Sequence, residues 1–452
     1  MSGTFRRALV AAGMSRPAAA AKEELFTRAI DALRAHDVSA ESPGAWFAPG
    51  RVEVLGKHTD YAGGRSLLCT VERGICLVAT PRTDGRVCVI DAGLDDSATF
   101  PFDPDIEPPI GHWSNYPMTV VRRVARNFPD ARRGLDIALA SDLPLSAGLS
   151  SSSALVVAIF LAVSDVNDLE RDDTYRREIT SREALASYLG CVENGQSFGA
   201  LAGDRGVGLF GGSEDQTAIL CCAPRTLSQF SFCPIRAEGT VPVPEGYTFT
   251  IANSGVLAEK TGAARDAYNR ASVATRVILE LWNEATGRTD ISLAAAAASS
   301  PEAPDTIRQL IRGAPHAEYP SGVLVDRFDQ FVEESTRIIP QARGALDVGK
   351  LERFGALVDE SQQNVERWLG NQIAETIALQ RQARALGAAA ASAFGAGFGG
   401  SVWALVQEAA AEEFAHEWNT RYHLAFPEAG PAAEVFVTAS GPPALQLVHP
   451  GL

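Results

Sequence analysis

The stretch GKHTDYAGG places three polar side chains, Lys57, His58 and Asp60, within four positions of one another and beside a glycine-rich turn. Polar groups this dense either hydrate a surface loop or line a pocket for an equally polar ligand. A carboxylate and an imidazole next to a tight turn suit the recognition of sugar hydroxyls, which both donate and accept hydrogen bonds. Arg51, a little upstream, is by itself equally consistent with a salt bridge to Glu53.

A Gly/Ser loop that enters an apolar helix, LPLSAGLSSSSAL at residues 143–155, is the strongest single signal. The backbone N–H groups of a helix N-terminus, together with several hydroxyls, form a site for an anion, and phosphate is the common occupant. The loop has no lysine and is therefore not the GxxxxGK[ST] loop of the P-loop NTPases. An ordinary serine N-cap on a buried helix explains the same residues about as well.

Two further stretches carry weaker local signals. In GGSEDQTAI, Asp215 can accept a proton from a substrate hydroxyl, as an aspartate does in many phosphoryl transferases. Judged locally, Glu214 and Asp215 are better explained as acids that favour a helix N-terminus. The glycines of SAFGAGFGGSVWAL, residues 392–405, permit either a close backbone approach to a ligand or a tight turn before a strand.

The elements that must position these residues are strands and helices in mixed order, which indicates an α+β fold. Alternation in residues 51–55 predicts a strand, and Asp84-Gly85 predicts a hairpin between the strands that flank it. Apolar spacing predicts helices at residues 23–36, 119–127, 263–285, 325–338 and 350–386.

A change to short, proline-containing β segments around residues 225–250 predicts a domain boundary. We expect an N-terminal domain at residues 1–235 and a C-terminal domain at residues 236–452. The first ~20 residues are expected to be mobile or to form a short extra helix.

Composition excludes several classes of protein. A formal net charge of -15 over 452 residues argues against a nucleic-acid-binding protein, which would usually have a basic face. The seven cysteines form no CxxC pair and have no histidines at metal-ligand spacing, so we expect buried thiols in a reducing cytosol. No stretch approaches the ~20 apolar residues that span a bilayer, and the N-terminal apolar run is too short for a signal peptide. We therefore expect a cytoplasmic protein with no nucleic-acid or membrane partner.

Taken together and in this order, the four motifs resemble those of the GHMP small-molecule kinases, and specifically the galactokinases. PGRVEVLGKHTDYAGG is similar to that family's PGRVNLIGEHTDYNGG, and PLSAGLSSSSAL to its PLGAGLSSSAAL. GSEDQ is similar to the family's GxxDQ segment and FGAGFGG to its TGAGFGG. HWSNYP is similar to PWxNYV, and SGV followed by AYNR to the stretch that holds the family's substrate tyrosine.

The resemblance implies an ATP-dependent sugar 1-kinase that phosphorylates the anomeric hydroxyl of galactose or a related monosaccharide. It implies a two-domain α+β GHMP kinase fold, with a ribosomal-protein-like N-terminal domain, a ferredoxin-like C-terminal domain and the active site between them. ATP and Mg²⁺ are the implied cofactors. We expect a monomer or a weak dimer whose partners are the small-molecule sugar and ATP.

The same resemblance implies roles for individual residues. Asp215 would act as the base for the sugar hydroxyl, and Arg51 would hold Asp215 ionised and neutralise charge on the transferred group. The sugar would be bound by Lys57, His58, Asp60, Gly212 and Tyr268. ATP would be bound by Trp113, Gly148, Leu149, Ser150, Ser151, Ser152, Ser153 and Ala154.

Two further groups of residues follow from the resemblance. Ser152 and Glu193 would reach Mg²⁺, although this chain has extra residues between Glu193 and Asp215 compared with the family. Support for the substrates from the C-terminal domain would come from Gly395, Gly397, Gly399 and Gly400.

Two positions depart from the family's pattern. Galactokinases have asparagine where this chain has Glu53, and where it has Lys57 they have a glutamate that is usually assigned to the C6 hydroxyl of the sugar. An ammonium only donates hydrogen bonds and adds a positive charge. Three explanations of Lys57 therefore stay open. It faces the C6 carboxylate of a uronic acid such as galacturonate or glucuronate, or it faces a neutral C6 oxygen or a sugar without that group. In the third explanation, Lys57 pairs with Glu53 or Glu72 as a compensated charge swap.

A rival function of a different class is a non-catalytic sensor that binds ATP and a sugar. The intact Asp215, Arg51 and phosphate loop favour an active enzyme over such a sensor.

Overall fold

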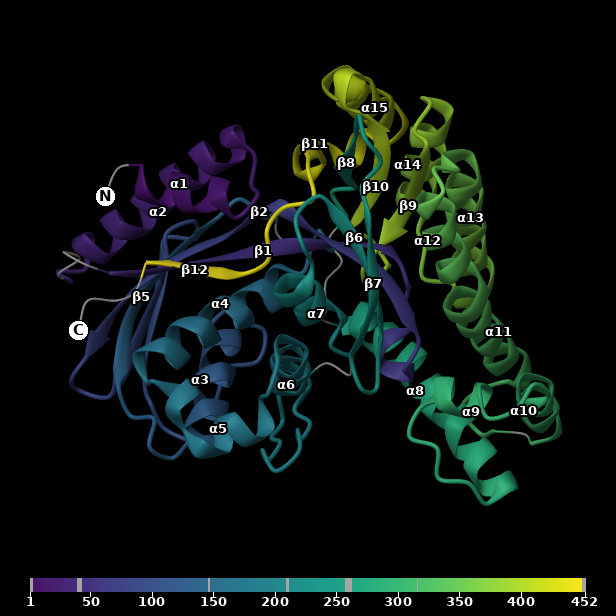
Figure 1. The fold of residues 1–452 in the computed structure, drawn as a ribbon, viewed down its shortest axis with the longest axis horizontal. Helices are drawn as coiled ribbons and strands as arrows, with labels where there is room; N and C mark the ends of the chain where they lie inside the picture. Colours follow the sequence, from purple (N-terminus) through teal and green to yellow (C-terminus); the bar gives the residue numbers. More distant parts are fainter. Residues whose placement is uncertain are drawn as a thin grey trace.

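A computed structural model describes residues 3–38, 43–144, 147–208, 211–256, 262–314 and 316–448. Within these residues the fold is a mixed α+β arrangement with two sheets, as the sequence predicts (Figure 1). The larger sheet has the strand order β12-β1-β2-β5-β3-β4, with β6 joined to β2 and β7 to β6. The smaller sheet has the order β11-β8-β10-β9.

The larger sheet draws strands from both ends of the chain. Its strands are β1 (Gly44–Leu55), β2 (Arg65–Arg82), β3 (Arg86–Asp91), β4 (Asp96–Pro101), β5 (Gly134–Ser141), β6 (Thr226–Ser231), β7 (Arg236–Pro242) and β12 (Leu445–Val448). The smaller sheet consists of β8 (Tyr247–Asn253), β9 (Ala390–Phe394), β10 (Ser401–Gln407) and β11 (Glu434–Thr438). The domain boundary at 235/236 stays a prediction; β7, which follows it, still pairs with β6 of the larger sheet.

Both faces of the larger sheet are buried, and the side chains of its strands alternate between two cores. Phe47 and Val78 pack with helices α1 (Thr4–Ala11) and α2 (Arg16–Ala35), whereas Trp46 and Leu77 belong to the main core on the opposite face. The expectation of a short extra helix near the N-terminus is thus met by α1.

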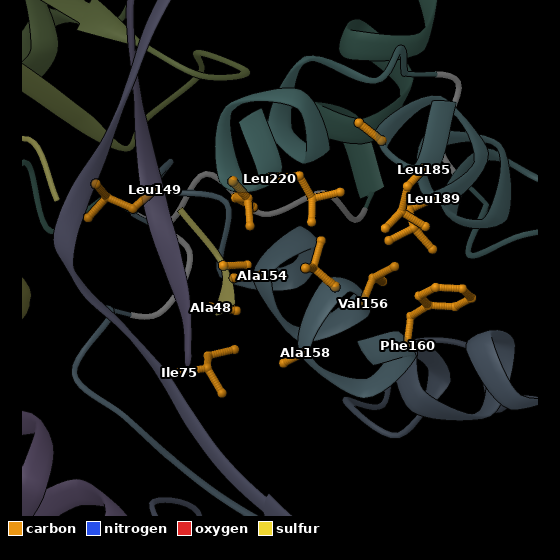
Figure 2. Packing of buried hydrophobic residues seen from close by; sticks show 14 of the residues in the cluster. Ala48, Ile75, Leu149, Ala154, Val156, Ala158, Phe160, Leu185, Leu189 and Leu220 are labelled. Carbon is orange, nitrogen blue, oxygen red and sulfur yellow. The ribbon is translucent and has the colours of Figure 1, made fainter. Parts of the chain in front are cut away.

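Helix α4 (Ser151–Val166) is the centre of the main core (Figure 2). It lies between the sheet, represented by Ala48 and Ile75, and a layer of helices that supplies Leu189 and Leu220. That layer consists of α3 (Asn115–Asn127), α5 (Asp173–Glu178), α6 (Arg182–Asn194) and α7 (Glu214–Cys221). This packing holds the N-terminus of α4, and with it the Gly/Ser loop, against β1, where the N–H of Arg51 donates to the carbonyl of Leu149 at 3.2 Å.

The C-terminal half adds a group of helices at one end of the molecule (Figure 1). Helices α8 (Gly262–Thr286), α9 (Leu293–Ala297), α10 (Ala303–Gly313) and α11 (Ser321–Val332) share a separate core, into which Ala62 of the GKHTDYAGG stretch also packs. A π-helical turn and helix α12 follow, at Glu333–Ile338 and Ile339–Asp347. The smaller sheet is covered by α13 (Leu351–Asn364), α14 (Ala374–Ala385) and α15 (Ala411–Ala425).

Two local predictions are wrong. The strands on either side of Asp84-Gly85 form no hairpin, because β5 lies between β2 and β3 and pairs with both. The helix predicted over residues 350–386 is interrupted at Gly370, which has a φ of 66° and ends one helical segment before α14 begins.

The remaining global predictions concern cysteines and membrane spans. All seven cysteines are free thiols, but Cys233 is exposed and only Cys69, Cys76 and Cys222 are fully buried. In the described part of the chain, no helix has the length and apolar character needed to cross a bilayer.

Candidate active site

A cavity of about 550 Å³ collects residues from all four motifs. Its walls come from β1 and the loop after it, the N-terminus of α4, the ends of α6 and α7, and the glycine loop after β9. The predicted residues that line it are Arg51, His58, Asp60, Trp113, Gly148, Ser150, Ser151, Ser152, Ser153, Glu193, Gly212, Asp215 and Gly395.

Several predicted residues are not among those that line the cavity. Leu149 and Ala154 are buried in the main core, and Lys57 is buried behind the cavity wall. Gly397, Gly399 and Gly400 lie further along the glycine loop. The side chain of Tyr268 lies outside the described residues, so its predicted contact with the sugar stays a prediction.

Arg51 and Asp215 form an ion pair on the cavity wall. The Arg51 Nη2 atom lies 2.7 Å from Asp215 Oδ1, and Nε donates to the same oxygen at 2.8 Å. Arg51 Nη1 donates to the carbonyl of Gly148, so the guanidinium links the carboxylate to the Gly/Ser loop. Burial alone would lower the pKa of Arg51, but Asp215, Glu214 and Glu53 together raise it above its ordinary value. The guanidinium is therefore a fixed positive charge beside Asp215.

Ser153 joins this ion pair to Glu193. Its hydroxyl donates to Glu193 Oε2 at 2.8 Å and lies 3.3 Å from Asp215 Oδ2. The amide of Gln216 also donates to Glu193 Oε2, at 2.6 Å. The serine at the first turn of α4 and the two acids thus form one connected group on the cavity wall.

The extra residues between Glu193 and Asp215 leave that group intact. They leave the end of α6 and return to it, since Val207 N donates to the carbonyl of Glu193 at 2.9 Å. The returning segment is held by a buried ion pair, with Arg122 Nε 2.7 Å from Asp204 Oδ2. Residues 194–207 thus form a loop that closes on the end of α6, and Glu193 lines the cavity.

The Gly/Ser loop needs backbone conformations that few residues adopt. Gly148 has a φ of 76° and Ser150 a φ of 60°, which turns the chain into the first turn of α4. The glycine loop after β9 lies against it, because Ser401 Oγ donates to the carbonyl of Ala147 at 2.6 Å. A Cβ atom on Gly395 would lie 3.1 Å from the carbonyl oxygen of Gly148. The two loops come this close because both contain glycine at the contact.

The GKHTDYAGG loop is held from behind by the C-terminal half. Arg327 donates to the carbonyl of His58, and Gln330 Nε2 donates to that of Lys57 at 3.1 Å. The N–H of Gly56 donates to Glu334 Oε1 at 2.9 Å. Helix α11 and the π-helical turn therefore set the position of this loop.

His58 lies in the cavity wall as a neutral imidazole. Burial, together with the charge of Arg327, lowers the pKa of His58 to about 4. Its Nε2 lies 3.1 Å from the carbonyl of Ala396, which can only accept, so the proton is on Nε2. Its Nδ1 then accepts from Tyr61 Oη at 2.9 Å. His58 thereby joins its own loop to the glycine loop of the C-terminal half.

Asp60 faces Gly212 and the start of α7. Its Oδ2 accepts from the backbone N–H of Glu214 at 3.1 Å. A Cβ on Gly212 would lie 2.1 Å from that same oxygen, so only glycine fits there. Burial raises the pKa of Asp60 above its ordinary value, although the Glu214 and Tyr61 N–H groups lower it.

Glu53 and Glu214 add two more buried carboxylates to the cavity wall. Burial raises the pKa of Glu53 to about 7 against the charges of Lys57 and Arg51, and it raises that of Glu214 well above its ordinary value. The sugar loop therefore lies in an acidic surrounding, where Arg51 is the only lysine or arginine among the described lining residues.

Three family sequence models match the chain. The galactokinase galactose-binding signature matches residues 35–81, the GHMP kinases N terminal domain residues 115–195, and the GHMP kinases C terminal domain residues 342–424. A galactokinase from Roseiflexus sp. (strain RS-1) is 29% identical over 398 residues, which cover 86% of this chain and 89% of that protein.

The chain belongs to the galactokinase family of the GHMP kinases. Another relative, the galactokinase from Actinobacillus pleuropneumoniae, is 32% identical over 214 residues, or 46% of this chain and 50% of that protein. This galactokinase-family chain is an ATP-dependent phosphotransferase that acts on a sugar hydroxyl.

Solved structures show the same fold. Lactococcus lactis galactokinase complexed with galactose aligns with a TM-score of 0.76 at 22% sequence identity, covering 93% of this chain and 98% of that one. The mevalonate kinase of Methanococcus jannaschii aligns with a TM-score of 0.52 at 14% identity, covering 89% of this chain and 99% of that one. The predicted α+β GHMP kinase fold is confirmed.

Sequence reasoning did not anticipate some residues of the cavity wall. Glu53, Tyr61, Asn194 and Glu214 all line it, but none had been assigned to a ligand. For Glu53 a signal was available: it is two positions from Arg51 in the same strand, and alternate residues of a strand face the same side. No comparable pattern was available for Asn194, whose side chain joins the end of α6 to the backbone of Gly211 and Gly212.

Proposed function

We propose that this galactokinase-family kinase transfers the γ-phosphoryl group of ATP to the anomeric hydroxyl of galactose or a closely related neutral hexose. One observation carries the proposal: the Arg51–Asp215 ion pair lines the same cavity as the Gly/Ser loop and the sugar loop. Phosphoryl transfer needs positioned substrates and neutralised charge more than covalent help from the protein.

In the proposed step the anomeric oxygen attacks the γ-phosphorus. A new oxygen–phosphorus bond forms, the bond from that phosphorus to the β–γ bridging oxygen breaks, and ADP leaves. Asp215 accepts the hydroxyl proton. Arg51 neutralises charge on the transferred group, and its bonds to Asp215 and Gly148 keep it oriented for this.

The remaining substrate contacts follow the family motifs. The first turn of α4 offers backbone N–H groups and serine hydroxyls to the ATP phosphates, with Ser151, Ser152 and Ser153 all on the cavity wall. Asp60 and His58 contact the sugar beside Gly212. Tyr268 on the sugar and Trp113 on the nucleotide complete the proposed set.

The residues present fit Mg²⁺ held jointly with the nucleotide. Within the described chain, no cluster of three or more acidic, histidine or cysteine side chains could hold a metal on its own. Kinases typically bind Mg²⁺ through one or two carboxylates plus the substrate phosphates. Glu193 and a serine hydroxyl of the first turn of α4 provide oxygen donors of that kind: Ser153 lies nearest to Glu193, and Ser152 is the residue suggested by the motif. The ion would neutralise phosphate charge.

Two features favour a neutral sugar over a uronate. The Lys57 ammonium donates to Ser392 Oγ at 2.7 Å and is not on the cavity wall. Glu53, Asp60, Glu214 and Asp215 all line the cavity. A carboxylate on the substrate would lie among four acidic side chains, and Arg51, which is the only lysine or arginine among the described lining residues, is already paired with Asp215.

A panel of sugars tests this proposal. ADP release with galactose, glucose, galacturonate and glucuronate should be greatest with galactose, and NMR should locate the phosphate on the anomeric oxygen. Faster turnover of either uronate than of galactose would contradict the neutral-sugar proposal. Binding of ATP and sugar with no ADP release, unchanged by Asp215→Ala, would instead indicate the non-catalytic sensor.

A further inference from the structure

Glu53 has a carboxylate oxygen that accepts no hydrogen bond from the described part of the protein. Its side chain lies on the same face of β1 as Arg51, lines the cavity and is 3% exposed. One carboxylate oxygen, Oε2, accepts from the backbone N–H of Gly395 at a long distance of 3.4 Å. The other, Oε1, is buried and has no hydrogen-bond partner among the residues that the structure describes. A buried carboxylate oxygen without a partner is costly, so a donor supplied by the ligand would stabilise it.

The ammonium of Lys57 forms its hydrogen bonds within the C-terminal half, and Lys57 does not line the cavity. Its ammonium is fully buried and donates to Ser392 Oγ at 2.7 Å and to Ser361 Oγ at 3.4 Å. Ser361 Oγ in turn donates to Glu334 Oε1 at 2.9 Å, so the lysine is part of a network inside the C-terminal half. Position 57, where galactokinases have a glutamate, therefore presents no acceptor to a sugar in this chain.

The charges around Glu53 fit an acceptor role. Lys57 and Arg51 favour its ionised form, whereas burial and the carboxylates of Glu334 and Asp60 oppose it. A hydroxyl that donates to Oε1 would favour the carboxylate further. An ionised acceptor also forms a stronger hydrogen bond than the amide of an asparagine would.

We propose that Glu53 is a specificity-determining residue of the sugar site, whose Oε1 accepts a hydrogen bond from one hydroxyl of the bound sugar. It thereby supplies the carboxylate acceptor that position 57 lacks in this chain. This inference rests on the proposed function, because it requires a sugar in the cavity.

Deoxy analogues of galactose test the role of Glu53. We would measure kcat/KM for galactose and for its 2-, 3-, 4- and 6-deoxy analogues with the wild-type enzyme, with Glu53→Gln, which keeps an accepting oxygen, and with Glu53→Leu, which removes it. The wild type should lose about 10- to 100-fold on the analogue that lacks the hydroxyl bound by Glu53. With Glu53→Leu, galactose and that one analogue should become equal, mainly through a higher KM for galactose. Glu53→Gln should keep part of the discrimination.

A matched control and a second variant keep the test decisive. Glu352→Gln, on the exposed surface of α13, should leave every ratio unchanged. If Glu53→Leu fails to fold in a thermal unfolding assay, Glu53→Asn, whose oxygen is withdrawn by one methylene, replaces it in the same comparison. Ratios that all remain at their wild-type values would overturn the role of Glu53. Absence of galactose phosphorylation by the wild type would instead contradict the proposed substrate, and the deoxy series would then be built on whichever sugar the panel identifies.

Discussion

Two proposed parts of the cavity wall handle charge in different ways: a phosphoryl-transfer end, made of Arg51, Ser153, Glu193 and Asp215, and a sugar end, made of Glu53, Asp60 and Glu214. At the phosphoryl-transfer end each charge has a direct partner: the Arg51 guanidinium contacts Asp215, and Ser153 and Gln216 donate to Glu193. At the sugar end, the carboxylates of Glu53, Asp60 and Glu214 repel one another. The cation next to them, Lys57, bonds to serine hydroxyls of the C-terminal half.

We infer from this difference that the reaction and the choice of substrate depend on separate sets of residues. Phosphoryl transfer from ATP has the same electrostatic demands for any sugar, so the first end keeps the residues of the family motifs. The second end must match one arrangement of hydroxyls. There the chain differs from the family's motif at positions 53 and 57. A change at one end should therefore alter kcat and a change at the other should alter KM or stability.

The largest effect is expected at the phosphoryl-transfer end. Asp215→Asn removes the proton acceptor and the negative charge that pairs with Arg51 but keeps the size of the side chain, so kcat should fall about 10²- to 10⁴-fold. ADP release and thermal unfolding of the same preparation measure this. Asp31→Asn, on the exposed surface of α2, is the control. A kcat within a few-fold of the wild type would show that Asp215 is not the base.

A charge reversal at the sugar end should affect stability first. Lys57→Glu replaces a buried cation by an anion next to Glu53 and Glu334, and should reduce the free energy of unfolding by about 3–5 kcal/mol. Urea unfolding measures the change, and the exposed Lys350→Glu should be nearly neutral. A stable Lys57→Glu protein with faster turnover of galactose would mean that position 57 faces the sugar after all.

Arg51→Lys separates charge from geometry at the first end. Lysine keeps the positive charge but cannot contact Asp215 and Gly148 at the same time with a planar fork. We expect kcat to fall about 10²-fold with little change in KM for the sugar. Steady-state kinetics in both substrates measures the two constants separately. A rise in KM with unchanged kcat would assign Arg51 to the sugar end instead.

The most gradual effect concerns pH and the sugar end. The pKa of Glu53, about 7, lies above the ordinary value of 4.5, so between these values the native state holds a proton that the unfolded chain has lost. The free energy of unfolding of the wild type should therefore decrease relative to Glu53→Gln as pH rises from about 4.5 to about 7, by at most about 1.4 kcal/mol per pH unit. Urea unfolding of both proteins across this range measures the difference. A constant difference would mean that Glu53 titrates at its ordinary pKa.

Local sequence patterns predicted the helices and strands themselves better than they predicted which strands pair with each other. The helical and strand segments around the motifs were predicted where the periodicity was clear, as for α4 and β1. The hairpin at Asp84-Gly85 was not formed, because β5, some 50 positions further on, inserts between the two strands. A turn signal reports only the local reversal of the chain, and strand pairing depends on distant segments.

By itself, the sequence determined the order of the motifs, and with it the family, the reaction and the ion pair between Arg51 and Asp215. These rest on residues whose chemistry is the same in any sugar kinase of this type. Only the tertiary structure decided what Lys57 does. The direction of a buried side chain depends on the partners that surround it, and those of Lys57 are Ser361 and Ser392, 304 and 335 positions further along the chain. The same folding that turns Lys57 away leaves Glu53 on the cavity wall, where we propose that it contributes to the choice of sugar.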